Sequence, residues 1–279
     1  MFHALVAIKQ VPDTTNIRID PVTGTLVREG VPAIMNPYDA HALAAAVEWK
    51  RKLGGKITVI SMGPPAAITS LREAIEMGAD RSILISDRKF GGADTLATSY
   101  TLAQVIQAIH AQDPIDVVFF GKQAIDGDTA QVGPGVAVRL GWPILTYTIG
   151  IRNIDLENRR LVAERKTERW VEIVEVPLPA ALTCEKDIAP IPYAPLPDLL
   201  RSLRYQPEVW TTESGHCTFD PNQIGIKGSP TVVYKQGTPP LPTPGEKINA
   251  REIGTAEAVR HALDKAVASG VLKSILGGA

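Results

Sequence analysis

The sequence predicts an α/β protein built on a doubly wound, mostly parallel sheet. Apolar, β-prone runs alternate with helix-like runs through about the first 150 of the 279 residues. These apolar runs are nearly continuous, which is typical of strands buried on both faces of a parallel sheet. A long glycine-bearing loop follows one of the runs and leads into a helix, and this layout is suited to cradling phosphate.

Each predicted element has a local reason in the sequence. Gly54 follows the first helix, Pro64 and Pro65 suit the first turn of the second, and Asp94 is placed to cap the third. The predicted strands are Leu5–Ile8, Ile57–Met62, Ser82–Ser86 and Ile115–Phe120. The predicted helices are Tyr38–Leu53, a helix from Pro64 to Met77, Thr95–Ala111 and Thr129–Leu140.

Ligands of open α/β sheets bind beyond the carboxyl ends of the strands. Four loops of this chain lie at such ends, so we expect them to face one crevice. They are Ala7–Asp13, Ser61–Pro65, Ser86–Thr98 and Gly121–Val132.

The loop Gly121–Gly133, GKQAIDGDTAQVG, is the strongest candidate for a ligand site. It is neither a Walker A motif nor a GxGxxG fingerprint. Asp126 and Asp128 would repel a phosphate, so they fit better as a ribose hydroxyl acceptor and a helix cap. Gly127 is expected to supply backbone freedom. An ordinary strand-to-helix turn is the alternative interpretation.

The second half of the chain differs in character. Leu161–Glu164 and Trp170–Val176 predict a β-hairpin. Thirteen of the 22 prolines then fall between Pro177 and Pro244, which predicts an extended arm without regular structure. A helix over Thr255–Ser269, capped by Thr255, ends the arm. We therefore divide the chain into an α/β domain, residues 1–207, and a C-terminal arm and helix, residues 208–279, that pack on a partner.

Composition excludes several classes of protein. The net charge of −1 argues against nucleic-acid binding. The sequence contains no run of 18 apolar residues, so no membrane span is predicted. Two isolated cysteines and five scattered histidines predict neither a disulfide framework nor a metal site. A cytoplasmic, reducing location is expected.

Four segments in order resemble the beta subunit of electron-transfer flavoprotein. The resemblance covers about residues 1–200 well and implies an adenine-nucleotide-binding domain with flavodoxin-like layering. The segments are VAIKQVPDT (Val6–Thr14), MNPYDAHAL (Met35–Leu43), GADRSILISD (Gly78–Asp87) and GKQAIDGDTAQVG (Gly121–Gly133).

Further segments resemble the branch linked to electron bifurcation and to nitrogen fixation. In that branch the resemblance implies FAD in the crevice; in the respiratory branch it implies structural AMP. It also implies a heterodimer with an alpha subunit, NADH as electron donor, ferredoxin or flavodoxin as one acceptor, and a dehydrogenase or quinone oxidoreductase as another partner. The segments are Ile19–Pro32, Gly91–Ser99 and Ile226–Val233.

The resemblance also implies individual site residues. Ile188 falls at the apolar anchor of a loop that docks onto a dehydrogenase, whereas the hairpin sequence Arg165–Glu175 departs from the family pattern. Two of the implied ligands have other interpretations: Lys9 as a solvated lysine, and Asn36 as a helix cap. The implied cofactor-binding residues are Ala7, Lys9, Asn36, Pro37, Tyr38, Asp39, Met62, Gly63, Asp94, Thr95, Ala97, Thr98, Gly121, Lys122, Gln123, Ala124, Ile125, Asp126, Gly127, Asp128, Thr129, Ala130, Gln131 and Val132.

A non-catalytic scaffold that holds AMP, and a stand-alone nucleotide-binding domain, are the alternatives from other functional classes. No catalytic residue of this chain is predicted, because the chemistry would belong to the cofactor.

Overall fold

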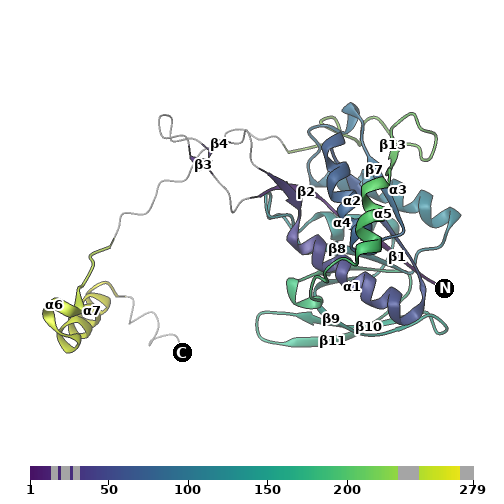
Figure 1. Cartoon of the computed structure of the whole chain (residues 1–279). Coiled ribbons are helices and arrows are strands. Elements are labelled where there is room, and N and C mark those ends of the chain that lie inside the picture. Colours follow the sequence, from purple (N-terminus) through teal and green to yellow (C-terminus); the bar gives the residue numbers. More distant parts are fainter. Residues whose placement is uncertain (14–17, 20–25, 28–31, 232–244, 271–279) are drawn as a thin grey trace. The chain divides into compact units, whose positions relative to one another are not determined.

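A computed structural model describes residues 1–13, 18–19, 26–27, 32–231 and 245–270 (Figure 1). Most of the segment Ile19–Pro32 and the end of Ile226–Val233 lie outside the described residues. The described chain forms two compact units, Met1–Tyr234 and Lys235–Ala279.

The first unit is built on a nine-stranded sheet in the order β11-β10-β9-β12-β8-β1-β6-β7-β13. Seven neighbouring strands run parallel, and β10 and β11 continue the sheet antiparallel. The strands are β1 (Phe2–Ala7), β6 (Gly55–Met62), β7 (Arg81–Ile85), β8 (Val117–Gly121), β9 (Ile144–Asp155), β10 (Arg160–Lys166), β11 (Val171–Pro177), β12 (Ala180–Cys184) and β13 (Glu208–Trp210).

Helices cover both faces of the sheet and create two apolar cores. On β1, Ala4 and Val6 belong to the core that includes α1 and α2, whereas Leu5 and Ala7 belong to the core that includes α3 and α4. This alternation follows from the two-residue period of a strand. The helices are α1 (Pro37–Leu53), α2 (Ile68–Glu76), α3 (Thr95–Gln112), α4 (Val132–Leu140) and α5 (Leu196–Arg204), of which α5 packs on α2.

The chain winds from β1 through β6 to β7 and then crosses to β8 on the other side of β1. The strand order therefore reverses between β1 and β8, and this is where open α/β sheets bind ligands. The predicted doubly wound α/β class is confirmed. Smaller pieces complete the unit: strands β2 (Gln10–Pro12), β3 (Arg18–Ile19), β4 (Leu26–Val27) and β5 (Ala33–Met35), and the short helices η2 (Pro65–Ala67), η3 (Arg88–Phe90) and η4 (Lys186–Ile188).

Regular structure continues where the prolines predicted an irregular arm. Strand β12 lies between β8 and β9 and is fully buried, and the segment also contributes α5 and β13. Pro177 and Pro179 both precede β12 and neither lies within it, so its backbone hydrogen bonds remain. Strand β13 belongs to the sheet, and the first compact unit of the structure extends through Tyr234.

The second unit contains α6 (Ala250–Ile253) and α7 (Thr255–Ala268). Thr255 begins α7 but does not cap it, because Gly254 occupies the N-cap position. Val259, Leu263 and Val267 follow one another at helical spacing on α7, and each is about half exposed within the described residues.

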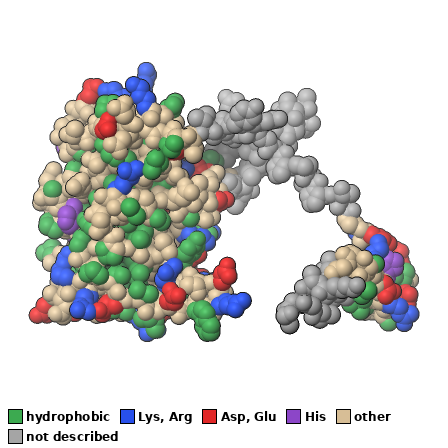
Figure 2. Space-filling model, turned by 180° about the vertical axis from the view of Figure 1, so that it is seen from behind, with side chains coloured by type: hydrophobic (Ala, Val, Ile, Leu, Met, Phe, Trp, Pro, Cys, Tyr) green, Lys and Arg blue, Asp and Glu red, His purple; other side chains and the backbone are tan. Residues whose placement is uncertain are grey.

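Figure 2 shows acidic and basic side chains interspersed over one face of the first unit, in keeping with the net charge of −1. Among the helices in the described ranges, none combines the length and apolar character needed to cross a membrane.

Candidate functional site

The first turn of α1 ties together the strand ends on either side of the switch point. Asp39 is almost fully buried, and its carboxylate accepts hydrogen bonds from the N–H groups of Lys9 (2.7 Å) and Gly121 (3.0 Å). Lys9 follows β1, and Gly121 ends β8. One carboxylate therefore connects the ends of β1 and β8.

Gly121 is required by this close approach. A Cβ added there would lie 2.7 Å from the Tyr38 Cβ and closer still to the Asp39 carboxylate. A side chain at this position would push α1 away from β8, so the glycine permits the helix to reach the strand end.

Asn36 holds the start of the candidate loop. Its amide nitrogen donates to the Gln123 carbonyl (2.9 Å), and its amide oxygen accepts from the Ile125 N–H (3.3 Å). The alternative role as a cap of α1 is not observed, because the Asn36 side chain makes no capping hydrogen bond. The nitrogen and the oxygen of the Asn36 side-chain amide instead both bind the loop backbone.

The second half of the loop lies in the open. Lys9 Nζ pairs with both carboxylate oxygens of Asp126 (2.7 and 2.8 Å), and Gln123 donates to Asp128 (2.7 Å). The expected cap is absent, because α4 begins at Val132 with no side-chain cap. Only the N–H groups of Val132 and Gly133 are left for another acceptor, because Pro134 has no N–H and the Gly135 N–H donates to the Gln131 carbonyl (2.9 Å).

Left-handed backbone occurs in this loop at positions the sequence did not indicate. Asp128 and Ala130 have φ angles of 51° and 53°, whereas Gly127 has an ordinary φ and a Cβ there would meet nothing within 4 Å. The expected need for glycine at Gly127 is wrong. Two strained non-glycine residues in one loop are a feature of functional sites.

The start of α3 forms the other wall of this region. Asp94 caps the helix as predicted, accepting from the N–H groups of Leu96 (2.9 Å) and Ala97 (3.0 Å). Burial raises the pKa of Asp94, but the hydrogen bonds from Ala97 and Thr231 outweigh it and the net pKa is lowered. Thr95 Oγ1 donates to Gln131 Oε1 (2.7 Å), which joins α3 to the end of the loop.

A strap from the end of the first unit crosses the start of α3. Asp94 also accepts from the Thr231 N–H (3.2 Å) and hydroxyl (2.8 Å), and its own N–H donates to Ser229 Oγ (2.8 Å). Sequence reasoning singled out this segment by resemblance but did not connect it to Asp94. The contact spans more than 130 residues, so local pattern gives no signal for it.

The remaining predicted residues lie at or near the same strand ends. Ala7 is buried at the end of β1. Met62 ends β6, and Gly63 follows it, with its N–H donating to the Ile85 carbonyl (3.1 Å). Pro37 is the first residue of α1. In the first turn of α3, Ala97 is buried and Thr98 is half-buried.

A second cluster beside the loop joins the predicted residues Lys122 and Tyr38 to Glu185 and Tyr147, which the sequence did not indicate. Lys122 Nζ pairs with Glu185 (3.0 Å) and lies 5.5 Å from the Tyr38 ring centre and 5.3 Å from that of Tyr147. The hydrogen bond that Lys122 donates to Glu185 raises the pKa of Lys122. Tyr147 has a φ of 56°, which is rare for a bulky residue. Lys122 is thus directed to the strand ends of β9 and β12 and away from Asp126.

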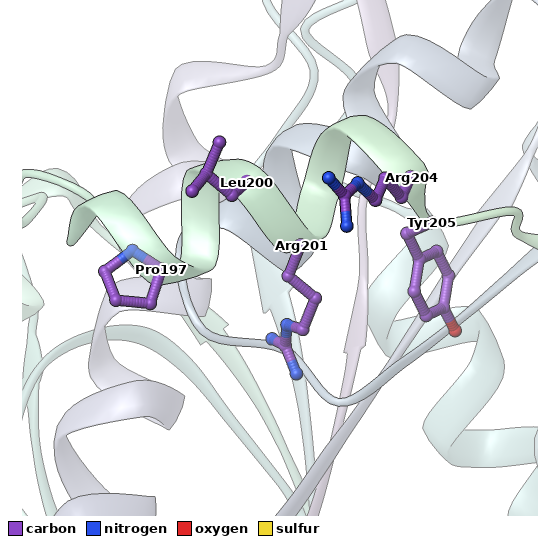
Figure 3. A pocket seen from close by; sticks show the side chains of 5 residues that line it. All are labelled: Pro197, Leu200, Arg201, Arg204 and Tyr205. Atoms are coloured by element: carbon purple, nitrogen blue, oxygen red, sulfur yellow. The ribbon is translucent and has the colours of Figure 1, made fainter.

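The predicted docking loop lies beyond β12. Ile188 is partly buried against the core, while Ile191, Tyr193 and Leu196 are the more exposed apolar side chains of the loop. The loop leads into α5, which carries a shallow pocket; its Arg201 donates to the carbonyls of Ile75 on α2 and of Ala79 after that helix (Figure 3). This pocket contains none of the predicted cofactor-binding residues. Its lining residues are Pro197, Leu200, Arg201, Arg204 and Tyr205.

Within the described ranges, no three or more His, Cys, Asp or Glu side chains are placed together so that they could hold a metal ion. Cys184 is buried, and burial raises the pKa of its thiol, which disfavours the nucleophilic thiolate.

The arrangement suits a phosphate-bearing ligand. The switch point combines an uncapped helix start at α4, a polar loop fastened at one end by Asn36, and Lys9 at the strand exit, where its ammonium group is paired with Asp126. Backbone N–H groups of this kind bind phosphate. The negative charge of Asp126 is neutralised by Lys9, so it does not oppose an anion.

Residues 23–201 match the electron transfer flavoprotein domain family. Three curated relatives extend the similarity over most of the chain. They are Protein FixA of Azotobacter vinelandii (48% identical, 85% of this chain and 84% of the relative), electron transfer flavoprotein subunit beta of Thermoanaerobacterium thermosaccharolyticum (46%, 88% and 91%) and caffeyl-CoA reductase-Etf complex subunit CarD of Acetobacterium woodii (43%, 89% and 92%).

Proposed function

The chain belongs to the electron transfer flavoprotein family, among its beta subunits and FixA proteins, and from this premise we propose that its switch-point crevice holds FAD. With an alpha subunit, the protein takes electrons from NADH. It passes them by bifurcation to ferredoxin or flavodoxin and to a dehydrogenase or quinone-linked acceptor.

One observation carries the proposal: the loop Gly121–Val132 is fastened to the first turn of α1 at one end and leads to an uncapped helix at the other. Such a loop is rigid where it meets the sheet and offers N–H groups where it meets α4. The flavin supplies the exchange of a hydride for single electrons.

The residues of this chain bind and orient the cofactor. The N–H groups of Val132 and Gly133 at the start of α4 hold phosphate oxygens, and Lys9, by pairing with Asp126, keeps that carboxylate from repelling them. Asp126 and Thr95 offer oxygen atoms to ribose hydroxyl groups. The other predicted cofactor-binding residues stay predictions of contact with the same ligand.

The partners follow from family membership and from the exposed apolar surface. We assign the alpha subunit to the C-terminal unit and a dehydrogenase to the loop that begins at Ile188. The CarD relative is named as part of a caffeyl-CoA reductase complex, which supports a dehydrogenase partner for this chain. We place the complex in the cytoplasm, where the free thiols Cys184 and Cys217 would stay reduced.

Cofactor content tests the proposal. The chain is co-expressed with its alpha subunit, and the purified heterodimer is extracted for flavin and AMP. We expect two FAD per heterodimer, no AMP, and bleaching of both flavins by NADH. One FAD with one AMP, and no bleaching by NADH, would overturn the proposal in favour of the respiratory type that holds AMP for structure.

A further inference from the structure

The strands β1 and β8 part where the crevice begins. Their backbone ladder pairs Ala4 with Val117 and continues to Ala7 and Phe120. Beyond that pair the connection passes to a side chain, because the Asp39 carboxylate accepts from the N–H of Lys9 on one side and of Gly121 on the other. A single carboxylate thus replaces the next rung of the ladder.

Asp39 is isolated from solvent and has few charged neighbours. It is 6% exposed. Lys9 follows β1, but its ammonium group is paired with Asp126, and Lys122 after β8 is paired with Glu185. From β12 the facing titratable group is Cys184, whose pKa is raised by burial and by Asp39.

We infer that Asp39 is a positioning residue whose ionised carboxylate sets the spacing of the β1 and β8 ends, so that nucleotide binding in the crevice weakens in mild acid. The inference rests on the proposed function for the nucleotide, but the spacing itself does not. Asp39 accepts hydrogen bonds from the backbone of Lys9 and of Gly121, and it acts on the site through these two residues.

Burial raises the pKa of Asp39 to about 7, against the opposing hydrogen bonds from Asn36, Lys9 and Gly121. Protonation would place an O–H donor where an N–H donor already points. One of the two amides would then lose its acceptor, and the strand end that carries it would be released.

The direct test follows amide hydrogen exchange in the full-length chain without added nucleotide. Asp39→Asn keeps the shape but replaces one acceptor with a donor. We expect exchange of the Lys9 and Gly121 amides to rise roughly tenfold or more. Glu48→Gln, which removes an exposed carboxylate from the same helix, is the matched control and leaves both amides unchanged.

Wild-type protein gives a test that does not depend on the variant folding. Corrected for the intrinsic pH dependence of exchange, protection of the same two amides should fall as the pH drops from 8 to 6. A flat profile would overturn the inference, as would unchanged exchange in a folded Asp39→Asn variant.

Nucleotide affinity separates this inference from the proposed function. FAD and AMP are titrated calorimetrically into wild type and Asp39→Asn between about pH 6 and 8. We expect wild-type affinity to fall as the pH drops and the variant to bind weakly at every pH. If wild type binds neither nucleotide while the exchange changes occur, the proposed function fails and the strand spacing role stands. If wild type binds with a flat pH profile, the link to binding fails.

Discussion

At the scale of single residues, the crevice depends on contacts that leave no room for an additional atom. The buried Asp39 carboxylate and Gly121 lie against each other, and Asn36 uses both ends of its amide on the loop backbone. These three residues come from two segments more than 80 positions apart. The close contact between α1 and β8 requires all three residue types at once.

The two loop glycines should respond differently to an added methyl group. Gly121→Ala forces α1 away from β8, so we expect a loss of about 1–3 kcal/mol in the free energy of unfolding and a loss of bound nucleotide. Urea unfolding and cofactor content measure the two effects. Gly127→Ala is the matched control, because its Cβ meets nothing within 4 Å; stability within about 0.5 kcal/mol of wild type is expected. Equal losses in both variants would contradict the packing argument.

At the scale of elements, the edge strand β13 is held by a charged pair as well as by its ladder. Arg81 on β7 donates two hydrogen bonds to Glu208 (2.6 and 2.8 Å), and the Ser86 N–H donates to the Trp210 carbonyl (3.0 Å). Trp210 is 2% exposed, so this short strand seals the second core rather than serving as an interface anchor.

The attachment of β13 should depend on pH in a defined direction. The hydrogen bond from Arg81 lowers the pKa of Glu208 below its ordinary value of 4.5. The pair therefore stabilises β13 above about pH 4.5 and is lost as the pH falls through the lowered pKa. Amide exchange over residues 208–212 should quicken in acid and, in Glu208→Gln, already at neutral pH. Glu213→Gln, an exposed pair with Lys89, is the control and should leave the strand protected.

At the scale of the whole molecule, the first unit contains the candidate site and the whole nine-stranded sheet. Its boundary falls after Tyr234, beyond the strap that hydrogen-bonds to Asp94. The second unit carries the exposed stripe of α7, whose apolar side chains suit the proposed alpha subunit.

Two truncations separate the units. A chain ending at residue 234 keeps β13, Trp210 and the strap, so we expect a cooperative unfolding transition and full nucleotide binding. It should no longer co-purify with the alpha subunit. A chain ending at residue 209 loses Trp210 from the core and should be destabilised by several kcal/mol. Retention of the alpha subunit by the longer truncation would contradict the assignment of α7.

Local sequence patterns were sufficient to predict the fold class and the position of the candidate loop. Continuous apolar runs such as Ile115–Phe120 can be buried only between two layers of helices, and Asp94 has the residue type of a cap wherever a helix starts. The same local reasoning failed at β12, because five residues that follow two closely spaced prolines carry too little periodicity to separate a strand from an irregular arm.

By itself the sequence determined a doubly wound sheet, a glycine-bearing loop at its switch point and family membership, because each is written in residues close together in the chain. Only the tertiary structure decided how the site is held. Asp39 reaches Lys9 and Gly121, Asn36 reaches the loop, and Thr231 reaches Asp94 across separations that no local pattern records. Left-handed backbone at Asp128 and Ala130 is likewise imposed by the surrounding contacts and not by a glycine.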